Sequence, residues 1–291
     1  MRKEFTIAVI GLGLIGGSIL KGLRYKKFHL IGISRSEETL NKAVELNLVD
    51  ECSTNIDIIK EAKIVFICTP MNKIISIIDE VKKWVYPDCI ITDVGGLKGF
   101  ILDYVNNYHV PINFIGGHPM AGSENKGIEQ SSENLFEEAK WVLTPSKWTN
   151  IEYMQELEGL IHYLGAKPIF ADSYEHDKAV TLISHMPLIL SQSLFGFLDS
   201  YPDENIKELA LKLAASGFRD TTRLAATNPE LAKDMLLKNK INIRDEIKKL
   251  KDYLIQLDEN LDLEEEKFID LIKNLAFKRK NMYSINGRNI Y

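Results

Sequence analysis

One histidine of this sequence stands in a setting that favours acid–base chemistry. His118 lies in Gly116-Gly117-His118-Pro119-Met120-Ala121-Gly122, where glycines on both sides and a proline restrict the loop backbone. The loop follows a short apolar run, so we expect it at the end of a strand. An imidazole there can take a proton from an alcohol whose carbon gives up a hydride. His118 is therefore the candidate catalytic base, and a purely structural histidine is the alternative.

A glycine pattern near the start of the chain predicts a dinucleotide site. Gly11-Leu12-Gly13-Leu14-Ile15-Gly16 follows the first apolar run and begins a helical pattern. Gly11 permits a tight turn, Gly13 lets a pyrophosphate approach the backbone, and Gly16 allows the helix to pack closely on the strand. The N–H groups at the start of the helix, where Leu14 and Ile15 lie, are free to bind phosphate. A glycine-rich turn without a ligand is the alternative.

The end of the second predicted strand bears on the choice of cofactor. It reads Ser34-Arg35-Ser36, without the carboxylate that accepts a hydrogen bond from the 2′-hydroxyl of NAD. Arg35 and the two hydroxyls can instead hold the 2′-phosphate, which favours NADP over NAD. The alternative is that Arg35 is a solvated surface charge and that Glu37 or Glu38 binds the ribose.

Two further strand ends supply cofactor candidates. Cys68-Thr69-Pro70 ends the third predicted strand, and Asp93 ends the fourth. The carboxyl ends of parallel strands meet at the sheet edge where the ligands of α/β proteins bind. We therefore expect Cys68, Thr69, Pro70 and Asp93 to line the cofactor, although Thr69-Pro70 also suits a simple strand ending.

Two polar stretches in the second half of the chain are candidates for a substrate site. His185 lies in Ser184-His185-Met186-Pro187, within an apolar helical run, where it is either a hydrogen-bonded core histidine or a polar wall of the pocket. Residues 216–223 contain two arginines and an aspartate at a break between helices. Arg219 can pair with the neighbouring aspartate, which leaves Arg223 to grip a substrate carboxylate at two points.

These residues require elements that position them. Up to about residue 170, short apolar runs alternate with amphipathic stretches, which implies βαβ units and a largely parallel sheet covered on both faces. The sequence thus predicts an α/β Rossmann-type dinucleotide-binding domain over residues 1–171. Its predicted strands are 6–10, 29–34, 64–68, 89–93, 113–116, 140–143 and 167–170, and the helical stretches between them include 37–46, 73–84, 98–105 and 151–164.

The strand pattern stops after Phe170, and residues 172–291 read as helices joined by short breaks. This predicts a second, all-α domain for substrate binding and dimerisation. Residues 230–257 keep a helical apolar pattern for longer than most globular helices run, which predicts one long helix. Its apolar stripe packs either within its own domain or against a second copy in a homodimer.

Composition limits the classes of function. The chain has 291 residues with 36 Lys and Arg against 41 Asp and Glu, a net charge of −5, so it lacks the basic surface that nucleic acid binding needs. Its three cysteines show no CxxC spacing, which argues against disulfides and a metal cluster and favours a reducing compartment. No apolar run approaches the length of about 18 residues that a membrane helix needs, so we expect a cytoplasmic protein without a membrane span.

Together these motifs resemble one enzyme family. The pattern of residues 11–16 and the stretches 68–70, 92–94, 114–122, 133–136, 143–145, 183–187 and 216–223 are similar to the prephenate/arogenate dehydrogenases of tyrosine biosynthesis. The resemblance covers nearly the whole chain, and residues 116–122 and 216–223 are specific to that family. It implies oxidative decarboxylation of prephenate or arogenate, giving 4-hydroxyphenylpyruvate or tyrosine, by an NAD(P)-dependent homodimer.

The resemblance also implies roles for residues. The family's catalytic histidine corresponds to His118, its substrate-carboxylate arginine to Arg223, and a histidine of the same pocket to His185. The Ser34-Arg35 pair resembles the members that prefer NADP. The expected partners are therefore a small-molecule substrate and a second copy of the chain, joined through the C-terminal helices.

One position departs from the family pattern. Relatives commonly carry a serine two residues before the lysine that is Lys98 here, and its hydroxyl assists the histidine at the substrate's ring hydroxyl; this chain has Gly96. A water or Ser123 could take its place. Two other functions stay open, a β-hydroxyacid-type dehydrogenase that would normally use a catalytic lysine, and a cofactor-sensing regulator without turnover. We expect no appended mutase or regulatory domain, so that any inhibition by tyrosine competes with substrate.

Overall fold

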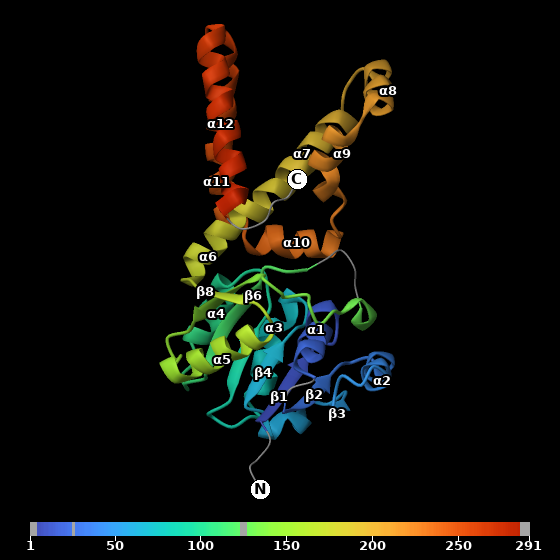
Figure 1. Ribbon diagram of the computed structural model, residues 1–291, viewed down its shortest axis with the longest axis vertical. Helices are drawn as coiled ribbons and strands as arrows, with labels where there is room; N and C mark the ends of the chain where they lie inside the picture. The colour runs from blue at the N-terminus through green and yellow to red at the C-terminus, as the bar shows by residue number, and fades with distance from the viewer. Residues whose placement is uncertain (1–4, 25–26, 123–126, 286–291) are drawn as a thin grey trace. The chain divides into compact units, whose positions relative to one another are not determined.

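One sheet of eight strands organises the first part of the molecule (Figure 1). The computed structural model describes residues 5–24, 27–122 and 127–285. The strand order is β3-β2-β1-β4-β5-β6-β7-β8, and all neighbours are parallel except β6 and β7. The strands are β1 (Phe5–Ile10), β2 (Phe28–Ile33), β3 (Glu51–Ser53), β4 (Ile64–Ile67), β5 (Ile90–Asp93), β6 (Phe114–Pro119), β7 (Lys140–Pro145) and β8 (Lys167–Phe170).

The strand order fixes the edge at which a ligand binds. From β1 the chain builds β2 and β3 on one side and then returns to pair β4 on the other side, so the order reverses between β1 and β4. Ligands of such sheets bind beyond the carboxyl ends of the strands at this reversal. Gly11 and Cys68 directly follow β1 and β4, so they lie at this edge.

Apolar cores cover both faces of the sheet, as the alternation of side chains along β1 requires. Ile7 and Val9 belong to one core, and Ala8 and Ile10 belong to the other. The first core includes buried side chains of α1 (Leu14–Leu23), α2 (Glu37–Glu45) and α5 (Ile151–Tyr163), and the second includes those of α3 (Ile74–Val81) and α4 (Gly99–Asn106). Short 3-10 turns complete this part: η1 (Ile56–Glu61), η2 (Met71–Lys73) and η3 (Ile128–Gln130).

Helices make up the rest of the described chain. They are α6 (Ser173–Val180), α7 (Met186–Asp199), α8 (Glu204–Leu213), α9 (Ser216–Thr222), α10 (Pro229–Lys238), α11 (Lys240–Glu259) and α12 (Glu265–Ile285), with the short turns η4 (Thr181–His185), η5 (Arg223–Ala226) and η6 (Asn260–Asp262). The contacts divide the chain into two compact units, Met1–Asn242 and Ile243–Tyr291. The first unit therefore holds the sheet together with α6 to α10. A domain boundary after residue 171 stays a prediction from the sequence.

The single long helix expected over residues 230–257 is wrong. The chain leaves helical geometry at Asn239, with φ −110° and ψ 19°, so that α10 and α11 are separate helices. The side chain of Asn239 is buried and donates a hydrogen bond to the hydroxyl of Thr181 over 2.7 Å. The break between α10 and α11 thus coincides with a hydrogen bond from Asn239 to a distant part of the chain, which the apolar pattern does not predict.

The segment Ser173–Asp199 is long and apolar enough to cross a membrane by length and composition alone. Three of its polar side chains, however, connect it to the rest of the first unit. His176, Asp177 and His185 are buried in this segment, and each is hydrogen-bonded to another part of the first unit. The segment thus positions polar groups within the protein.

Candidate active site

His118 lies at the carboxyl end of β6, next to the last residue of the strand. β6 lies between β5 and β7, and His118 is opposite Val142 of β7. The preceding glycines are required by packing, since a side chain on Gly117 would collide with the carbonyl oxygen of Asp93. The predicted strand ending at residue 116 therefore continues through the histidine, and β6 itself fixes the position of the imidazole.

A buried ion pair supports the loops on both sides of this histidine. The Lys98 ammonium contacts the Asp93 carboxylate and donates to the carbonyl oxygen of Gly117 over 2.7 Å. Asp93 also accepts from the backbone N–H groups of Gly95 (2.8 Å) and Gly117 (3.1 Å). Burial lowers the pKa of Lys98, while the charge of Asp93 opposes that shift. The side chain of Asp93 is thus used to hold the loop, and its predicted contact with a cofactor stays a prediction.

His118 is bonded to a second histidine that the sequence interpretation missed. Its Nδ1 lies 2.9 Å from Nε2 of His176, whose Nδ1 lies 2.8 Å from a carboxylate oxygen of Asp177. Both residues are in α6, and His176 is 58 positions along the chain from His118. In the sequence, only the adjacency of His176 and Asp177 in a helix with few apolar residues could have pointed to them. Such a pair does not by itself indicate a site.

The surroundings of His118 keep its ring neutral. Burial lowers the pKa of His118 to about 3, and the charge of nearby Lys98 adds to the shift. A neutral imidazole at neutral pH has one nitrogen with a lone pair that can take a proton. The arrangement can therefore act as a general base.

Gly96 leaves open space beside the other nitrogen of this ring. A Cβ on Gly96 would lie 3.8 Å from Nε2 of His118, at ordinary van der Waals distance. The backbone there is not left-handed; among the described residues only Gly11, Gly127 and Gly165 are glycines with positive φ. A serine would therefore fit at this position, as in the family pattern. Ser123, the other expected hydroxyl donor, lies outside the described residues.

His185 ends a π-helical turn between α6 and α7. Pro187, at the start of α7, lacks the N–H group that a regular helix would need, which favours such an irregular turn. Asn239 accepts from Asn242 through its side-chain oxygen, so its amide nitrogen donates to Nδ1 of His185 over 3.0 Å. Burial lowers the pKa of His185 to about 4. His185 is thus a neutral histidine with a hydrogen-bond partner, and its role in a pocket stays a prediction.

The two arginines of residues 216–223 have different settings. Arg219 forms the expected local pair with Asp220 at 2.9 Å, and both side chains are exposed. Arg223 begins η5, which packs against α7 through a hydrogen bond of 2.8 Å from the Ala225 N–H to Ser191. The role of Arg223 at a substrate carboxylate stays a prediction.

The glycine turn has the shape that a pyrophosphate requires. Gly11 has φ +98°, and a Cβ there would lie 2.7 Å from the carbonyl oxygen of Cys68. A side chain on Gly16 would collide with the Gly11 carbonyl, whereas nothing lies within 4 Å of a Cβ on Gly13. No side chain caps the first turn of α1, where Leu14 and Ile15 present their N–H groups.

Thr69 gives a second reason to place a cofactor at this edge. Its hydroxyl oxygen is buried and has no hydrogen-bond partner within the described part of the chain. Buried polar atoms without a partner are uncommon in native proteins. Together with the open position at Gly13, this atom fits a bound dinucleotide, and neighbouring Cys68 and Pro70 share the same strand end.

The end of β2 presents one cation and two hydroxyls. Arg35 is exposed, and its guanidinium has no ion pair or hydrogen bond with the residues that the structure describes. The hydroxyl of Ser34 accepts from the N–H of Ser36, and that of Ser36 caps α2 by accepting from Thr39. The cation at this strand end is therefore available to an anion.

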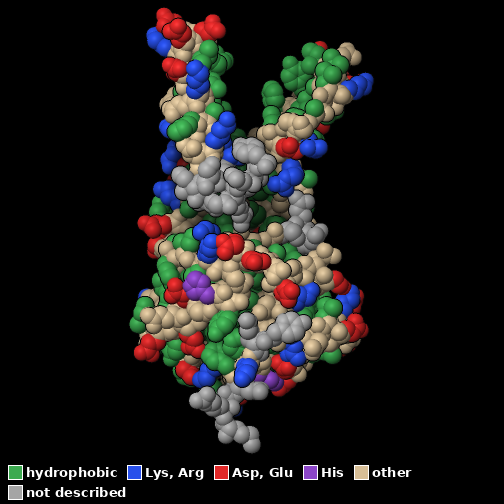
Figure 2. Space-filling model, in the orientation of Figure 1, with side chains coloured by type: hydrophobic (Ala, Val, Ile, Leu, Met, Phe, Trp, Pro, Cys, Tyr) green, Lys and Arg blue, Asp and Glu red, His purple; other side chains and the backbone are tan. Residues whose placement is uncertain are grey.

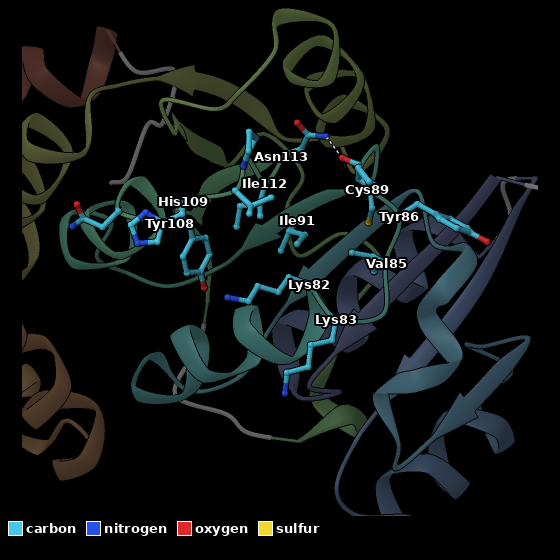
Figure 3. A pocket seen from close by; sticks show the side chains of 14 residues that line it. Lys82, Lys83, Val85, Tyr86, Cys89, Ile91, Tyr108, His109, Ile112 and Asn113 are labelled. Carbon is cyan, nitrogen blue, oxygen red and sulfur yellow. Dashed lines mark hydrogen bonds between the residues drawn. The ribbon is translucent and has the colours of Figure 1, made fainter.

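A separate cavity of about 560 Å³ lies in the sheet region (Figure 3). It is between the end of α3 and the loop after α4, at the amino ends of β5 and β6, and Tyr86, Tyr108 and Ile112 are among its walls. His118 and the glycine turn are at the opposite, carboxyl edge. This cavity is therefore not part of the candidate active site.

Comparison with known proteins identifies the family. Residues 20–170 match the family model of the prephenate dehydrogenase nucleotide-binding domain, and residues 172–277 match that of the prephenate dehydrogenase dimerization domain. The chain belongs to the prephenate dehydrogenase family. This confirms the expected order of a Rossmann-type domain followed by a helical dimerisation domain, and it confirms an NAD(P)-linked dehydrogenase.

Relatives of this prephenate dehydrogenase family member include a prephenate dehydrogenase and a cyclohexadienyl dehydrogenase. It is 38% identical to the prephenate dehydrogenase of Bacillus subtilis over 276 residues, which is 89% of this chain and 73% of that protein. The cyclohexadienyl dehydrogenase of Zymomonas mobilis is 29% identical over 243 residues, 80% of each chain.

Solved structures of the family have the same fold. The Synechocystis arogenate dehydrogenase superposes with a TM-score of 0.85 at 36% identity, covering 96% of this chain and 100% of that one. The A. aeolicus prephenate dehydrogenase, in complex with hydroxyphenyl propionate and NAD+, gives a TM-score of 0.87 at 28% identity, covering 96% and 98%.

Proposed function

We propose that this enzyme oxidatively decarboxylates prephenate, arogenate or both, with hydride transfer to NADP or NAD, to give 4-hydroxyphenylpyruvate or tyrosine. The observation that carries the proposal is the setting of His118. One ring nitrogen is bonded to His176, the other adjoins the open space at Gly96, and the ring stays neutral at physiological pH. This is the arrangement that accepting a hydroxyl proton at the carboxyl edge of a dinucleotide-binding sheet requires.

The residues divide the reaction between them. The glycine turn and Thr69 would hold the nicotinamide cofactor, which would supply the hydride acceptor. His118 takes the proton of the ring hydroxyl as the hydrogen on the same carbon departs as hydride. The bond to the ring carboxylate then breaks, carbon dioxide leaves, and its electron pair completes the aromatic ring. The chain need only orient the substrate and accept one proton.

Arg223 is proposed to hold a substrate carboxylate, and His185 to line the same pocket. Support comes from the position of His185 directly before α7, the helix on which η5 packs, and from Arg223 as the first residue of η5. A guanidinium can hold a carboxylate by two parallel hydrogen bonds, which fixes orientation as well as affinity.

A preference for NADP is proposed from the end of β2. Arg35 is exposed there without a partner in the described residues, and Ser34 and Ser36 flank it. Glu37 and Glu38 begin α2 beyond the strand end. A guanidinium at this point favours a cofactor that carries a 2′-phosphate.

A homodimer in the cytoplasm is the proposed working form. Figure 2 shows apolar side chains gathered over α8, and Ile206, Leu209 and Leu213 of this helix are exposed. Exposed apolar surface of this kind is typical of an interface. All three cysteines, Cys52, Cys68 and Cys89, are free, which agrees with a reducing compartment.

Turnover measurements test the function directly. The purified enzyme is assayed by absorbance of the reduced cofactor with prephenate and arogenate, each with NADP and NAD. We expect turnover with at least one substrate and a higher kcat/KM with NADP. His118→Ala should lower kcat roughly 10²–10⁴-fold with little change in KM. If neither prephenate nor arogenate is turned over, the proposal is contradicted and a β-hydroxyacid-type dehydrogenase or a cofactor-sensing regulator is favoured.

A further inference from the structure

Three side chains form a continuous hydrogen-bonded chain behind the proposed base. Nδ1 of His118 lies 2.9 Å from Nε2 of His176, and Nδ1 of His176 lies 2.8 Å from Oδ1 of Asp177. The two histidine rings meet edge to face with an interplanar angle of 77°. His176 and Asp177 are both buried. This series of hydrogen-bonded side chains thus connects the carboxyl edge of the sheet to α6, the first helix after the sheet.

The backbone decides the direction of every hydrogen bond in this chain. The N–H groups of Lys98 and Gly99 donate to the two carboxylate oxygens of Asp177 over 2.7 and 2.8 Å. The Asp177 carboxylate has only acceptors, so Nδ1 of His176 must be its donor. In a neutral His176 ring, Nε2 then carries a lone pair and accepts from Nδ1–H of His118. The remaining nitrogen of His118, Nε2, is therefore left with a lone pair.

We propose that His176 and Asp177 are positioning residues that hold His118 in the one tautomer whose Nε2 can accept the substrate's proton. The proposal rests on the proposed function for its catalytic consequence, but the tautomer itself exists without substrate. Without this chain the neutral His118 ring would divide between two tautomers, and the form with hydrogen on Nε2 cannot act as a base. A partner that fixes the tautomer is a known requirement of histidine bases.

The same chain stabilises the proton once it has been transferred. When Nε2 takes the hydroxyl proton, His118 becomes an imidazolium that still donates its Nδ1–H to His176. The His176 ring keeps its own hydrogen on the bond to Asp177, and the added proton leaves later from Nε2 to solvent. Atoms and charge balance without any further reactant.

The charged and titratable groups around His118 make this support necessary. Burial disfavours a positive charge on the ring, and so do the charges of Lys98 at the start of α4, His176 of α6 and His185 of η4. Asp93 is engaged with Lys98, and Asp177 is the carboxylate joined to His118 through His176. Loss of His176 would therefore leave the His118 imidazolium with a buried N–H that has no acceptor.

Two substitutions at one position separate positioning from simple packing. His176→Leu replaces the imidazole with an apolar side chain of similar bulk and so removes the acceptor for His118. His176→Gln supplies an amide oxygen that can accept from Nδ1–H of His118 in place of the ring nitrogen. Thr181→Val is the matched control. It removes a buried hydroxyl from the adjoining turn, which donates to the backbone carbonyl of Asp177 and accepts from Asn239. It leaves the hydrogen bonds among the side chains of His118, His176 and Asp177 in place.

The first measurement is the tautomer of His118 by ¹⁵N NMR of the histidine-labelled enzyme without substrate. We expect an unprotonated Nε2 in the wild type, in Thr181→Val and largely in His176→Gln, and a mixture of tautomers in His176→Leu. Thermal unfolding of each variant shows whether it is folded. Because no substrate is present, this result holds even if the proposed reaction proves wrong.

The second measurement is the pH profile of turnover. His176→Leu should lower kcat roughly 10–100-fold, the usual cost of losing a supporting partner, with KM for substrate and cofactor within about twofold. The acid limb of kcat/KM should lie at lower pH in His176→Leu than in His176→Gln, because both variants lose the charge of His176 but only His176→Leu loses the acceptor for the imidazolium. His176→Gln should recover most of kcat, and Thr181→Val should keep the wild-type limb. An unchanged tautomer in folded His176→Leu, or equal kcat and acid limb in both His176 variants, overturns the proposal.

Discussion

At the scale of single residues, Gly96 leaves space beside the proposed base. It stands where the family pattern predicts serine, and its Cβ position adjoins Nε2 of His118. If the enzyme works with glycine, an ordered water in this space is the simplest second hydrogen-bond partner for the ring oxygen.

Gly96→Ser should leave kcat/KM equal to or higher than that of the wild type. The added hydroxyl replaces the water, the backbone is not left-handed, and the nearest atom is 3.8 Å from the new Cβ. Steady-state kinetics and thermal unfolding measure both effects. Gly11→Ser is the contrasting control, since φ +98° and the carbonyl of Cys68 at 2.7 Å oppose any side chain there. A Gly96→Ser enzyme that melts earlier and turns over more slowly would contradict this expectation.

Arg35 provides a separate prediction about the cofactor. Arg35→Asp should shift the ratio of kcat/KM values from NADP toward NAD, because it removes an attraction for the 2′-phosphate and adds a repulsion. The ratio is measured in the same absorbance assay at saturating substrate. Lys42→Asp, further along in α2, is a control for charge alone, because Lys42 is already paired with Glu38 and Glu129. If the wild type prefers NAD, the interpretation of this strand end is wrong.

The sequence identified His118 as the candidate base and the glycine turn as the candidate cofactor site, but not the residues that contact the imidazole. His118 and Gly11–Gly16 are recognisable because a short stretch carries the whole signal. His176 and Asp177 act through a contact with a residue 58 positions away, and Asp93 and Lys98 are buried partners at close range. Only the fold brings these groups to one place, so spacing along the chain could not assign them.

At the scale of elements, the strands and helices of the sheet region were predictable wherever a buried face was long enough to leave a pattern. All strands were expected except β3, which has three residues and lies at the end of the sheet. It contributes too few buried side chains to show alternation. The helices α2 to α5 were likewise expected, because each buries a regular apolar stripe.

The expected long helix failed for a tertiary reason. Asn239 interrupts the apolar pattern by one residue only, which a sequence pattern tolerates. In the structure its amide group donates to the Thr181 hydroxyl and to His185, and its oxygen accepts from Asn242. The break between α10 and α11 therefore positions an amide against the π-helical turn.

Asn239→Ala should destabilise the enzyme by roughly 1–3 kcal/mol, because it leaves the ring nitrogen of His185 and the Thr181 oxygen without their buried donor. Urea unfolding at fixed protein concentration measures the change. Asn205→Ala, on the exposed face of α8, removes the same group without a buried partner and should change the free energy of unfolding by no more than about 0.5 kcal/mol. Equal stability of the two variants would show that the Asn239 bonds are replaced by solvent.

At the scale of the whole molecule, the first compact unit joins the sheet to the helices that follow it through polar contacts at the active site. Asp177 of α6 accepts from the N–H groups at the start of α4, and His176 contacts His118 of β6. The same contacts therefore bind the helical segment to the sheet and orient the base. Stability and catalytic geometry are coupled in this part of the molecule.

This coupling predicts how stability depends on pH. Burial lowers the pKa of His118 to about 3 and that of His185 to about 4, whereas both titrate near 6.5 when the chain unfolds. Between these values the unfolded chain binds more protons than the folded one, so the free energy of unfolding is highest above about pH 7 and falls as the pH decreases. The loss approaches about 1.4 kcal/mol per pH unit for each histidine once the pH is below 6.5.

Urea unfolding at pH 7.5 and pH 5.0, with enzyme concentration held constant, measures this dependence in a range where most carboxylates remain ionised. His185→Gln removes one of the two groups and should make the decrease in stability smaller. His162→Gln changes an exposed histidine in α5 and should leave the decrease as it is in the wild type. A free energy of unfolding that is the same at both pH values would mean that His118 and His185 take up protons in the folded enzyme, and a neutral His118 base at low pH would then be untenable.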